Sequence, residues 1–234
     1  IISMVSYPDF DLNKRDKIAD LNFINRATKG VYELGSVFKT FTVAAGLEEG
    51  LIDTDTEFLN LEKKLQCGKS SISEYDNKIP SDLTVEQILI RSGNIGSVRI
   101  GQKLEIIKLK AFLEKIGILS KINFDIEEVG EPIPFKWGKC KLATVSFGHG
   151  ITTTPLQLAK AYAIISNGGF TVEPSLIKSE LKNNQQKKRI IKAGISEQIN
   201  SILRKIVTTK EGTAGLVNIE GYEVGGKTGT AQKT

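Results

Sequence analysis

The segment from Gly35 to Gly50 is the feature that most constrains the fold of this chain. Apolar residues fall on most sides of its helical projection, Ser36 can cap its start, and Gly50 can close its end. We therefore predict a buried helix at the centre of the molecule. Lys39 lies inside this apolar helix, where an unpaired ammonium group is costly, so a structural role alone does not explain it.

The rest of the chain predicts a helix-rich α/β domain with strands at both chain ends and without an internal repeat or linker. The predicted strands are Ile1–Val5, Phe170–Ile177 and a Gly-rich strand over Tyr222–Ala231. A short helix is predicted to open with a capping box at Thr84 and to be interrupted at Gly93. Three further helices are predicted over Leu104–Ile116, 155–168 and Ser196–Val207. Residues 51–80 are polar and are predicted to be loop.

Composition and charge exclude several classes of protein. The chain has 32 Lys and Arg against 27 Asp and Glu, but only Lys187–Arg189 forms a tight basic run, and aromatic residues do not interleave it. We interpret that run as a solvated turn and expect no nucleic-acid partner. One His and two Cys cannot supply a Cys/His zinc site, so we expect no metal. We interpret Cys67 and Cys140 as free, separately buried thiols. No apolar run reaches the roughly 18 residues needed to span a bilayer.

Three short patterns carry the candidate chemistry: Ser36-x-x-Lys39, Ser92-x-Asn94 and Lys227-Thr228-Gly229. Positions i and i+3 of a helix share one face, so a neutral Lys39 could take the proton of the Ser36 hydroxyl. The helix N-terminus adds backbone donors where an oxyanion would develop. Asn94 can bind an amide of a peptide-like substrate, and Ser92 can relay a proton. Gly229 lets a substrate backbone approach closely, while Thr228 and Lys227 offer a carboxylate a hydroxyl and a positive charge.

Local context separates the Ser36 pattern from two chance matches. Chance alone predicts roughly two Ser-x-x-Lys patterns at this composition, and Ser175–Lys178 and Ser179–Lys182 also match. Both follow Pro174 in an extended or turn-like stretch, where positions i and i+3 do not share a face. Ser36 instead follows a glycine and opens a buried helix, as a nucleophile at a helix N-terminus should.

Longer stretches of the chain resemble the transpeptidase domain of class B penicillin-binding proteins, especially the division-type enzymes. The matching stretches, in family order, are IISMVSYPDFDLN, INRATKGVYELGSVFKTFTVAAGLEEG, ILIRSGNIGSVRIGQKL, VSFGHGITTTPLQLAKAYAIISNGGF and YEVGGKTGTAQK. The serine–lysine, Ser-x-Asn and Lys-Thr-Gly set is typical of penicillin-binding proteins and of class A β-lactamases. The resemblance implies the penicillin-binding protein/serine β-lactamase-like fold, with an antiparallel sheet and a helical subdomain.

The resemblance also implies a reaction. A D-Ala-D-Ala stem peptide, or penicillin, would acylate Ser36, and the acyl group of the stem peptide would pass to an amine of a neighbouring strand of peptidoglycan. The implied catalytic residues are Ser36, Lys39, Ser92 and Asn94, and the implied substrate-binding residues are Lys227, Thr228, Gly229 and Thr230. The backbone amides of Ser36 and Thr230 would form the oxyanion hole. No cofactor is implied.

We expect the whole chain, residues 1–234, to be one transpeptidase domain. The resemblance implies that it is incomplete, because family members continue past the Lys-Thr-Gly strand with further strands and a C-terminal helix. It also implies a place on the periplasmic face of the bacterial inner membrane, through an N-terminal helix outside this chain. A glycosyltransferase and membrane proteins of the division machinery are the implied partners. Expressed alone, the chain is expected to aggregate or to bind penicillin far more slowly than the complete domain.

Two other functions stay open. A serine β-lactamase needs a water-activating base, and the candidate Glu57–Asn60 pattern precedes Ser92, whereas the class A element follows the Ser-x-Asn site. A penicillin-recognising sensor would keep its serine acylated, and the motifs do not exclude it. His149 suggests a serine–histidine pair, but the family uses no histidine base, so we interpret it as structural. We interpret Phe135 and Trp137 as loop-packing residues.

Overall fold

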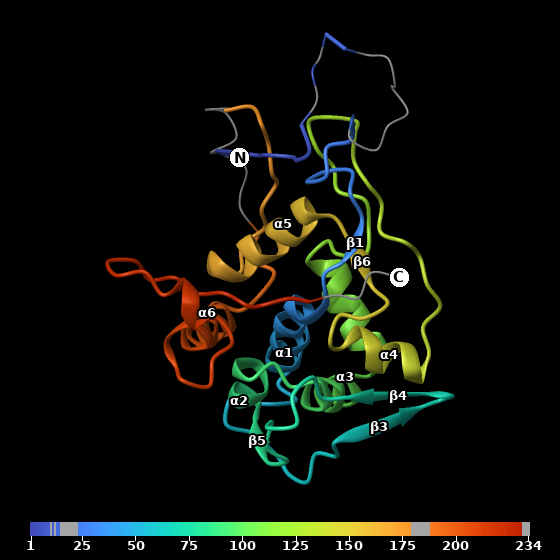
Figure 1. The fold of residues 1–234 in the computed structure, drawn as a ribbon, viewed down its shortest axis with the longest axis vertical. Helices are drawn as coiled ribbons and strands as arrows, with labels where there is room; N and C mark the ends of the chain where they lie inside the picture. Colours follow the sequence, from blue (N-terminus) through green and yellow to red (C-terminus); the bar gives the residue numbers. More distant parts are fainter. Residues whose placement is uncertain (10, 12, 15–22, 179–187, 231–234) are drawn as a thin grey trace.

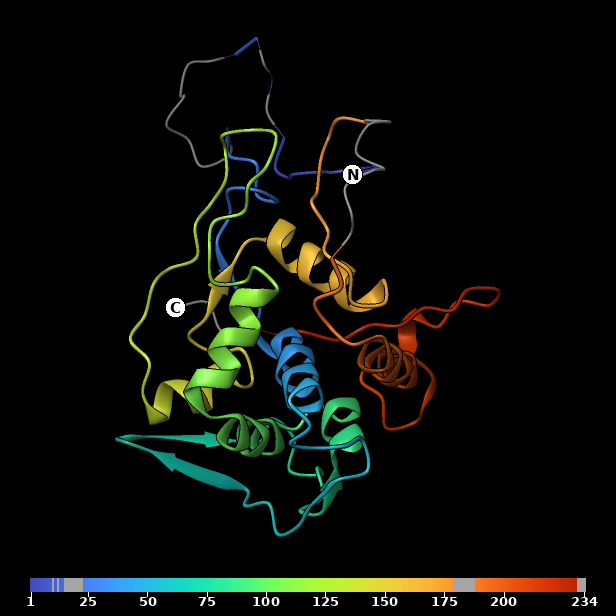
Figure 2. The same ribbon diagram turned by 180° about the vertical axis from the view of Figure 1, so that it is seen from behind.

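The computed structural model describes residues 1–9, 11, 13–14, 23–178 and 188–230. Helix α1 (Lys39–Glu48) lies at the centre of these residues with the other helices around it (Figures 1 and 2). The surrounding helices are α2 (Val85–Ile90), α3 (Asn94–Lys115), α4 (Lys139–Val145), α5 (Pro155–Ser166) and α6 (Ala193–Thr208). Every residue of α1 from Lys39 to Leu47 is buried, so the predicted central helix is confirmed.

The apolar character of α1 on most sides follows from its neighbours. Phe41 packs edge-on against Phe38 and against Tyr162 of α5, with ring centroids 5.6 and 5.2 Å apart. Helices α2, α3 and α6 also contact α1. A helix without a solvent-facing side has no need of a polar face, which explains why its sequence lacks one.

Local signals place the helix boundaries well. The predicted capping box at Thr84 is present, with Gln87 as its partner, and α2 ends before the predicted break at Gly93. Thr154 forms a second capping box at the start of α5, whose first residue is Pro155. Helix α3 consists of two helical stretches that meet at Glu105, where φ is 59°. The predicted helices over Leu104–Ile116, 155–168 and Ser196–Val207 all correspond to observed helices.

The described residues contain three antiparallel sheets of two strands each. The pairs are β1 (Tyr32–Glu33) with β6 (Thr152–Thr153), β2 (Glu57–Phe58) with β5 (Leu83–Thr84), and β3 (Lys64–Cys67) with β4 (Ser70–Ser73). The β3–β4 hairpin lies below α3 and α4 in the view of Figure 1. The prediction of loop over 51–80 is therefore wrong at β2, β3 and β4 and right for the residues between and around them. Within β4 only Ile72 is buried, so the hairpin lacks the apolar alternation that reveals a strand.

The predicted strands at the chain ends are also wrong. Ile1–Val5 forms no strand, and its side chains are mostly exposed. Phe170–Ile177 contributes a single bridge, from Phe170 to Arg189. The described part of Tyr222–Ala231 is extended but unpaired, and Ala231 itself lies outside the described residues. Extended backbone becomes a strand only when a neighbouring strand pairs with it, and among the described residues only the Phe170–Arg189 bridge does so here.

A disulfide joins Cys67 to Cys140, so the prediction of free thiols is wrong. Cys67 ends β3, Cys140 lies in the first turn of α4, and their Cα atoms are 5.4 Å apart. The 73 residues between the two cysteines hid their proximity, because separation along the chain carries no information about distance in the fold. The bond ties the tip of the hairpin to α4.

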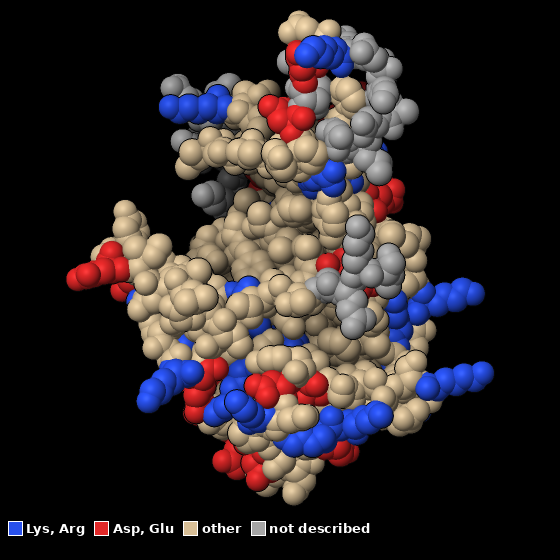
Figure 3. Space-filling model, viewed as in Figure 1, with Lys and Arg blue, Asp and Glu red and all other residues tan. Residues whose placement is uncertain are grey.

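The surface mixes both signs of charge. Lys and Arg side chains lie among Asp and Glu over the lower part of the face seen in Figure 3. Arg189, from the predicted basic turn, lies over the Phe170 ring at 4.2 Å and donates to the Gly168 carbonyl at 2.6 Å; Lys187 lies outside the described residues. Of the helices in the described ranges, none combines the length and the apolar character required to cross a membrane.

Candidate active site

Ser36 lies in a 3-10 turn, η2 (Gly35–Phe38), that leads directly into α1. Gly35 has a φ of 58°, in the left-handed region, and bends the chain before the serine. The predicted capping role of Ser36 is wrong, because α1 begins only at Lys39, where the described residues provide no side-chain cap. The Ser36 side chain is partly buried, and its hydroxyl has no hydrogen-bond partner among the described residues.

The ammonium group of Lys39 is fully buried and fully hydrogen-bonded. Its Nζ donates to the Ser92 carbonyl at 2.5 Å, to Ser92 Oγ at 3.1 Å and to Asn94 Oδ1 at 2.7 Å. These acceptors lie where α2 ends and α3 begins. The cost of burying a lysine in an apolar helix is thus offset by three acceptors from the second predicted motif.

Ser92 connects the lysines of two motifs. Its side chain is 4% exposed, and Ser92 Oγ lies 3.1 Å from Lys39 Nζ and 2.8 Å from Lys227 Nζ. The φ of Ser92 is 58°, a conformation that costs a non-glycine residue about 1 kcal/mol or more. Such strain persists where the surroundings fix the residue, and here both lysines do so.

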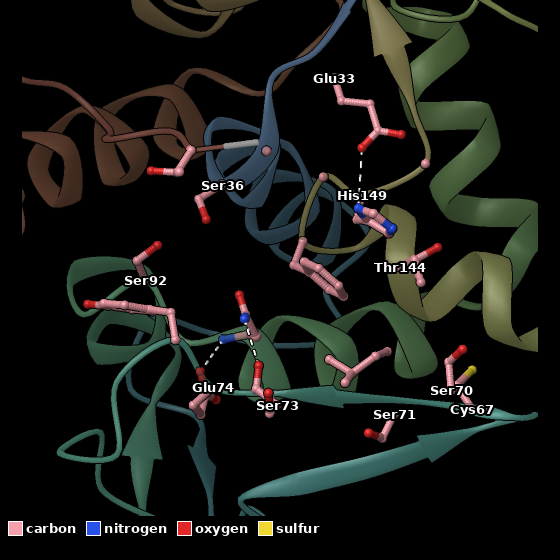
Figure 4. A pocket seen from close by; sticks show the side chains of 18 of the residues that line it. Glu33, Ser36, Cys67, Ser70, Ser71, Ser73, Glu74, Ser92, Thr144 and His149 are labelled. Atoms are coloured by element: carbon pink, nitrogen blue, oxygen red, sulfur yellow. Dashed lines mark hydrogen bonds and ion pairs between the residues drawn. The ribbon is translucent and has the colours of Figure 1, made fainter. Parts of the chain in front are cut away.

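Asn94, the first residue of α3, is held from both sides. Its Oδ1 accepts from Lys39, and its Nδ2 donates to the Ser73 carbonyl of β4 at 2.8 Å (Figure 4). The Glu74 carboxylate accepts from the backbone N–H groups of Asn94 at 2.6 Å and Ile95 at 2.8 Å. A carboxylate at this position satisfies free amides and complements the helix dipole. Sequence reasoning missed Glu74, because it lies 20 residues before Asn94 and gives no local capping signal for α3.

The Lys227–Thr230 segment packs against the turn that carries the serine. A Cβ at Gly229 would lie 2.8 Å from the Leu34 carbonyl oxygen and 2.8 Å from Val37 Cγ1, so only glycine allows this approach. The segment therefore uses its glycine to reach the protein's own backbone. Room for a substrate backbone, the reason given from the sequence, stays a prediction.

The side chains of this segment face the other motifs. Lys227 Nζ donates to Ser92 Oγ and to Thr228 Oγ1 at 3.3 Å, and Thr228 Oγ1 lies 2.8 Å from Thr213 Oγ1. Thr213 was not among the predicted site residues, because no motif includes it. The structure thus brings Lys39, Ser92 and Lys227 into one hydrogen-bonded cluster.

Burial sets the protonation of the two lysines. Burial lowers the pKa of Lys39 from 10.5 to about 7; the positive charge of Lys227 lowers it too, and the Glu74 carboxylate raises it. Burial also lowers the pKa of Lys227, to about 8. Near neutral pH a large fraction of Lys39 is therefore neutral and able to accept a proton, whereas most Lys227 stays charged.

A cavity of about 1000 Å³ opens beside these residues. Ser36, Ser92, Asn94, Thr228 and Thr230 line it together with the exposed serines of β4 and the Cys67–Cys140 disulfide (Figure 4). All three predicted motifs thus border one cavity.

Other predicted residues lie around or away from the cavity. His149 borders it, and its Nδ1 lies 3.2 Å from a Glu33 carboxylate oxygen. Glu57, considered as a base, lies in β2 and does not line the cavity. Phe135 and Trp137 pack on each other with ring centroids 5.0 Å apart, as predicted for loop-packing residues. The described residues contain no group of three His, Cys, Asp or Glu side chains that could hold a metal ion.

Comparison with known sequences gives a consistent result. A family model described as penicillin binding protein transpeptidase domain matches residues 1–234. The chain is 31% identical over 235 residues to a probable peptidoglycan D,D-transpeptidase FtsI of Caulobacter vibrioides and 31% identical over 248 residues to stage V sporulation protein D of Bacillus subtilis. All of this chain aligns, but it spans only 40% and 38% of these relatives.

Solved structures confirm the predicted fold. A structure described as a peptidoglycan glycosyltransferase from Burkholderia ambifaria superposes with a TM-score of 0.82 at 25% identity, covering 91% of this chain and 67% of that one. The transpeptidase domain of penicillin-binding protein 3 from Burkholderia pseudomallei superposes with a TM-score of 0.83 at 24% identity, covering 90% of this chain and 63% of that one. The latter likeness concerns the fold alone.

Proposed function

The chain belongs to the penicillin binding protein transpeptidase domain family, and from that premise we propose that it is the catalytic unit of a serine D,D-transpeptidase. Its substrates would be peptidoglycan stem peptides that end in D-Ala-D-Ala, and β-lactams would acylate the same serine. The single observation that carries this proposal is the hydrogen-bonded cluster of Lys39, Ser92 and Lys227, whose Ser92 lines the same cavity as Ser36.

The first half of the reaction uses the neutral form of Lys39. The Ser36 Oγ attacks the carbonyl carbon of the penultimate D-Ala, and its proton passes to Lys39 one turn away. The peptide bond breaks, and the terminal D-Ala leaves with a proton delivered through the Ser92 hydroxyl. An ester between the stem peptide and Ser36 remains. The backbone amides of Ser36 and Thr230 would hold the oxyanion, and both residues line the cavity.

The second half transfers the acyl group. An amine nitrogen of a second stem peptide attacks the ester carbon, a C–N bond forms, and the bond to Ser36 Oγ breaks. The proton lost by the amine returns to Ser36 Oγ through Lys39. The charged Lys227 and the Thr228 hydroxyl would bind the carboxylate of the donor peptide.

We propose that residues 1–234 form one transpeptidase unit that acts in septal cell-wall synthesis, outside the cytoplasm at the bacterial inner membrane. The name of the Caulobacter relative supports the reaction, and the Cys67–Cys140 disulfide supports an oxidising compartment such as the periplasm. A glycosyltransferase and membrane proteins of the division machinery remain proposed partners.

Labelling with a fluorescent penicillin tests the assignment. We expect covalent labelling of the wild-type protein and none of Ser36→Ala, followed by gel fluorescence and intact mass. Ser175→Ala is a matched control, because Ser175 begins another Ser-x-x-Lys pattern but hydrogen-bonds Asp125 away from the cavity. Labelling that persists in Ser36→Ala would overturn the proposal. A second experiment loads Ser36 with a stem-peptide acyl group from a thioester donor; if that acyl group stays on the serine in the presence of an amine acceptor, the protein is a sensor instead.

A further inference from the structure

Two extended segments border the cavity, and the proposed function uses only one of them. Lys227–Thr230 lies on the side of Ser36, because Gly229 packs against Leu34 and Val37 of the same turn. Strand β4 lies across the cavity from Ser36, with Ser70, Ser71 and Ser73 along it (Figure 4). A transpeptidase binds two peptides at once, so the second segment requires an explanation.

The outer edge of β4 has free backbone groups. The Ser73 carbonyl accepts from Asn94 Nδ2, so it points away from β3. In an antiparallel strand the N–H and C=O of one residue point to the same side, and alternate residues share that side. Ser71 therefore also directs its N–H and C=O away from β3. Outside the β3–β4 ladder, no described group hydrogen-bonds the Ser71 backbone.

The surroundings of this edge suit a polar, extended ligand. Ser70, Ser71 and Ser73 are exposed and line the cavity, so hydroxyl groups flank the free backbone. The cavity continues to the disulfide and to Lys141 of α4, whose ammonium donates to the Gly150 carbonyl at 2.5 Å. Free strand edges recognise extended peptides through main-chain hydrogen bonds.

We propose that the outer edge of β4 binds the acceptor stem peptide as an added strand, which directs its amine toward the acyl group on Ser36. This inference rests on the proposed function. The donor occupies the Lys227–Thr230 side while its acyl group is esterified to Ser36, so the acceptor must approach across the remaining cavity. The amine nitrogen then attacks the ester carbon, the C–Oγ bond breaks, and the amine proton returns to Ser36 Oγ through Lys39.

Substitution Ser71→Pro tests the edge directly. Proline removes the outward N–H but leaves the β3 ladder, and proline is tolerated at edge positions whose N–H faces away from the sheet. Loss of one main-chain hydrogen bond predicts a fall of roughly five- to tenfold in the ratio of aminolysis to hydrolysis of the acyl-enzyme. The readout is product partitioning of a thioester donor with an amine-bearing stem peptide. Ser71→Ala keeps the backbone N–H, so the ratio of aminolysis to hydrolysis must fall less in this variant than in Ser71→Pro.

Substitution Thr144→Trp tests the same site without altering β4. Thr144 lies on α4 and lines the cavity, so an indole there narrows the path along β4, whereas Thr144→Ser does not. We expect Thr144→Trp to lower the partition ratio as well, with fluorescent-penicillin labelling of Ser36 retained. This variant decides the matter if Ser71→Pro fails to fold.

The outcomes separate this inference from the proposed function. Wild-type protein that is not labelled at Ser36 refutes the proposed function itself. Labelled wild-type protein, with an unchanged partition ratio in a folded Ser71→Pro or in Thr144→Trp, refutes the acceptor site alone. An equal fall in Ser71→Pro and Ser71→Ala would assign the effect to the hydroxyl and also refute main-chain recognition.

Discussion

The two ends of the cavity are built in opposite ways. The lysine end consists of Lys39, Ser92 and Lys227, whose side chains are buried or partly buried and hydrogen-bond one another. The hairpin end consists of Ser70–Glu74 and the Cys67–Cys140 disulfide, which present exposed hydroxyls, free backbone groups and a covalent tie. Burial shifts the pKa values of the two lysines, whereas the exposed strand edge keeps backbone groups free for further hydrogen bonds.

Asn94 and Glu74 join the two ends. Asn94 hydrogen-bonds Lys39 on one side and the Ser73 carbonyl on the other, and Glu74 caps the helix that carries Asn94. A change at the hairpin can therefore reach the lysines through one residue.

The largest expected effect is at the lysine end. Lys39→Ala removes the proposed base, so the rate of acylation by penicillin should fall about a thousandfold. Stopped-flow or gel-based labelling measures this rate, with circular dichroism to confirm folding. Lys110→Ala, an exposed lysine paired with Glu114, is the control. A Lys39→Ala protein that acylates within a few-fold of wild type would exclude this lysine as the base.

Removal of the disulfide should lower the free energy of unfolding more than it lowers the rate of acylation at Ser36. A bond that closes a loop of 73 residues contributes roughly 4 kcal/mol to the free energy of unfolding in the chain-entropy model. The free energy of unfolding of the double variant Cys67→Ala/Cys140→Ala, measured with urea, should be lower than that of the wild type by about this amount. Acylation at Ser36 should change less than aminolysis, because the disulfide lies at the hairpin end. Equal losses in both half-reactions would show that the two ends are not independent.

The pH dependence of the acylation rate tests whether Glu74 of the hairpin end influences Lys39 of the lysine end. The proposed reaction uses neutral Lys39 and charged Lys227. Acylation should therefore rise with pH through about 7 and fall above about 8, as Lys227 loses its charge. The Glu74 carboxylate raises the pKa of Lys39. Glu74→Gln removes this charge, together with one of the two acceptor oxygens for the N–H groups of Asn94 and Ile95. Without the charge, the acid limb of the pH–rate profile should move to lower pH.

Glu114→Gln is the control for that shift, because Glu114 lies on the exposed face of α3 and pairs with Lys110. A purely structural role for Glu74 would lower the rate at every pH without moving the acid limb. An acid limb that moves to higher pH would contradict the electrostatic argument.

The smallest effect is expected outside both ends. Arg99 and Glu62 form an exposed ion pair with side chains 32% and 49% accessible. Such pairs contribute about 0.2–1 kcal/mol, so Glu62→Gln should change the urea midpoint only slightly and leave acylation unaffected. A loss of acylation in this variant would mean that the cavity is sensitive to distant surface charge.

The sequence predicts the lysine end far better than the hairpin end. The helix around Lys39, the capping box at Thr84 and the break beside Ser92 follow from local signals that are confirmed. The sequence predicts that Gly229 allows another backbone to approach closely. The structure shows such an approach, and the neighbouring backbone is that of Leu34. The roles of the site residues remain predictions.

The hairpin end depends on contacts that no local pattern encodes. Strands β3 and β4 contain few apolar residues, so their periodicity is weak. The Cys67–Cys140 bond joins two segments that meet only in the fold, the hairpin and α4. The extended segments at residues 1–5 and 222–230 have strand-like composition but no described partner, and pairing rather than composition makes a strand.

The hydrogen bonds of Ser92 have a consequence for how the protein is made. Its two lysine partners lie 53 residues before it and 135 residues after it. A ribosome that has not yet completed position 227 therefore holds a chain without the cluster, however well its earlier helices have folded. Reactivity toward penicillin would then appear only after residue 227 has been made and has folded back onto Ser92.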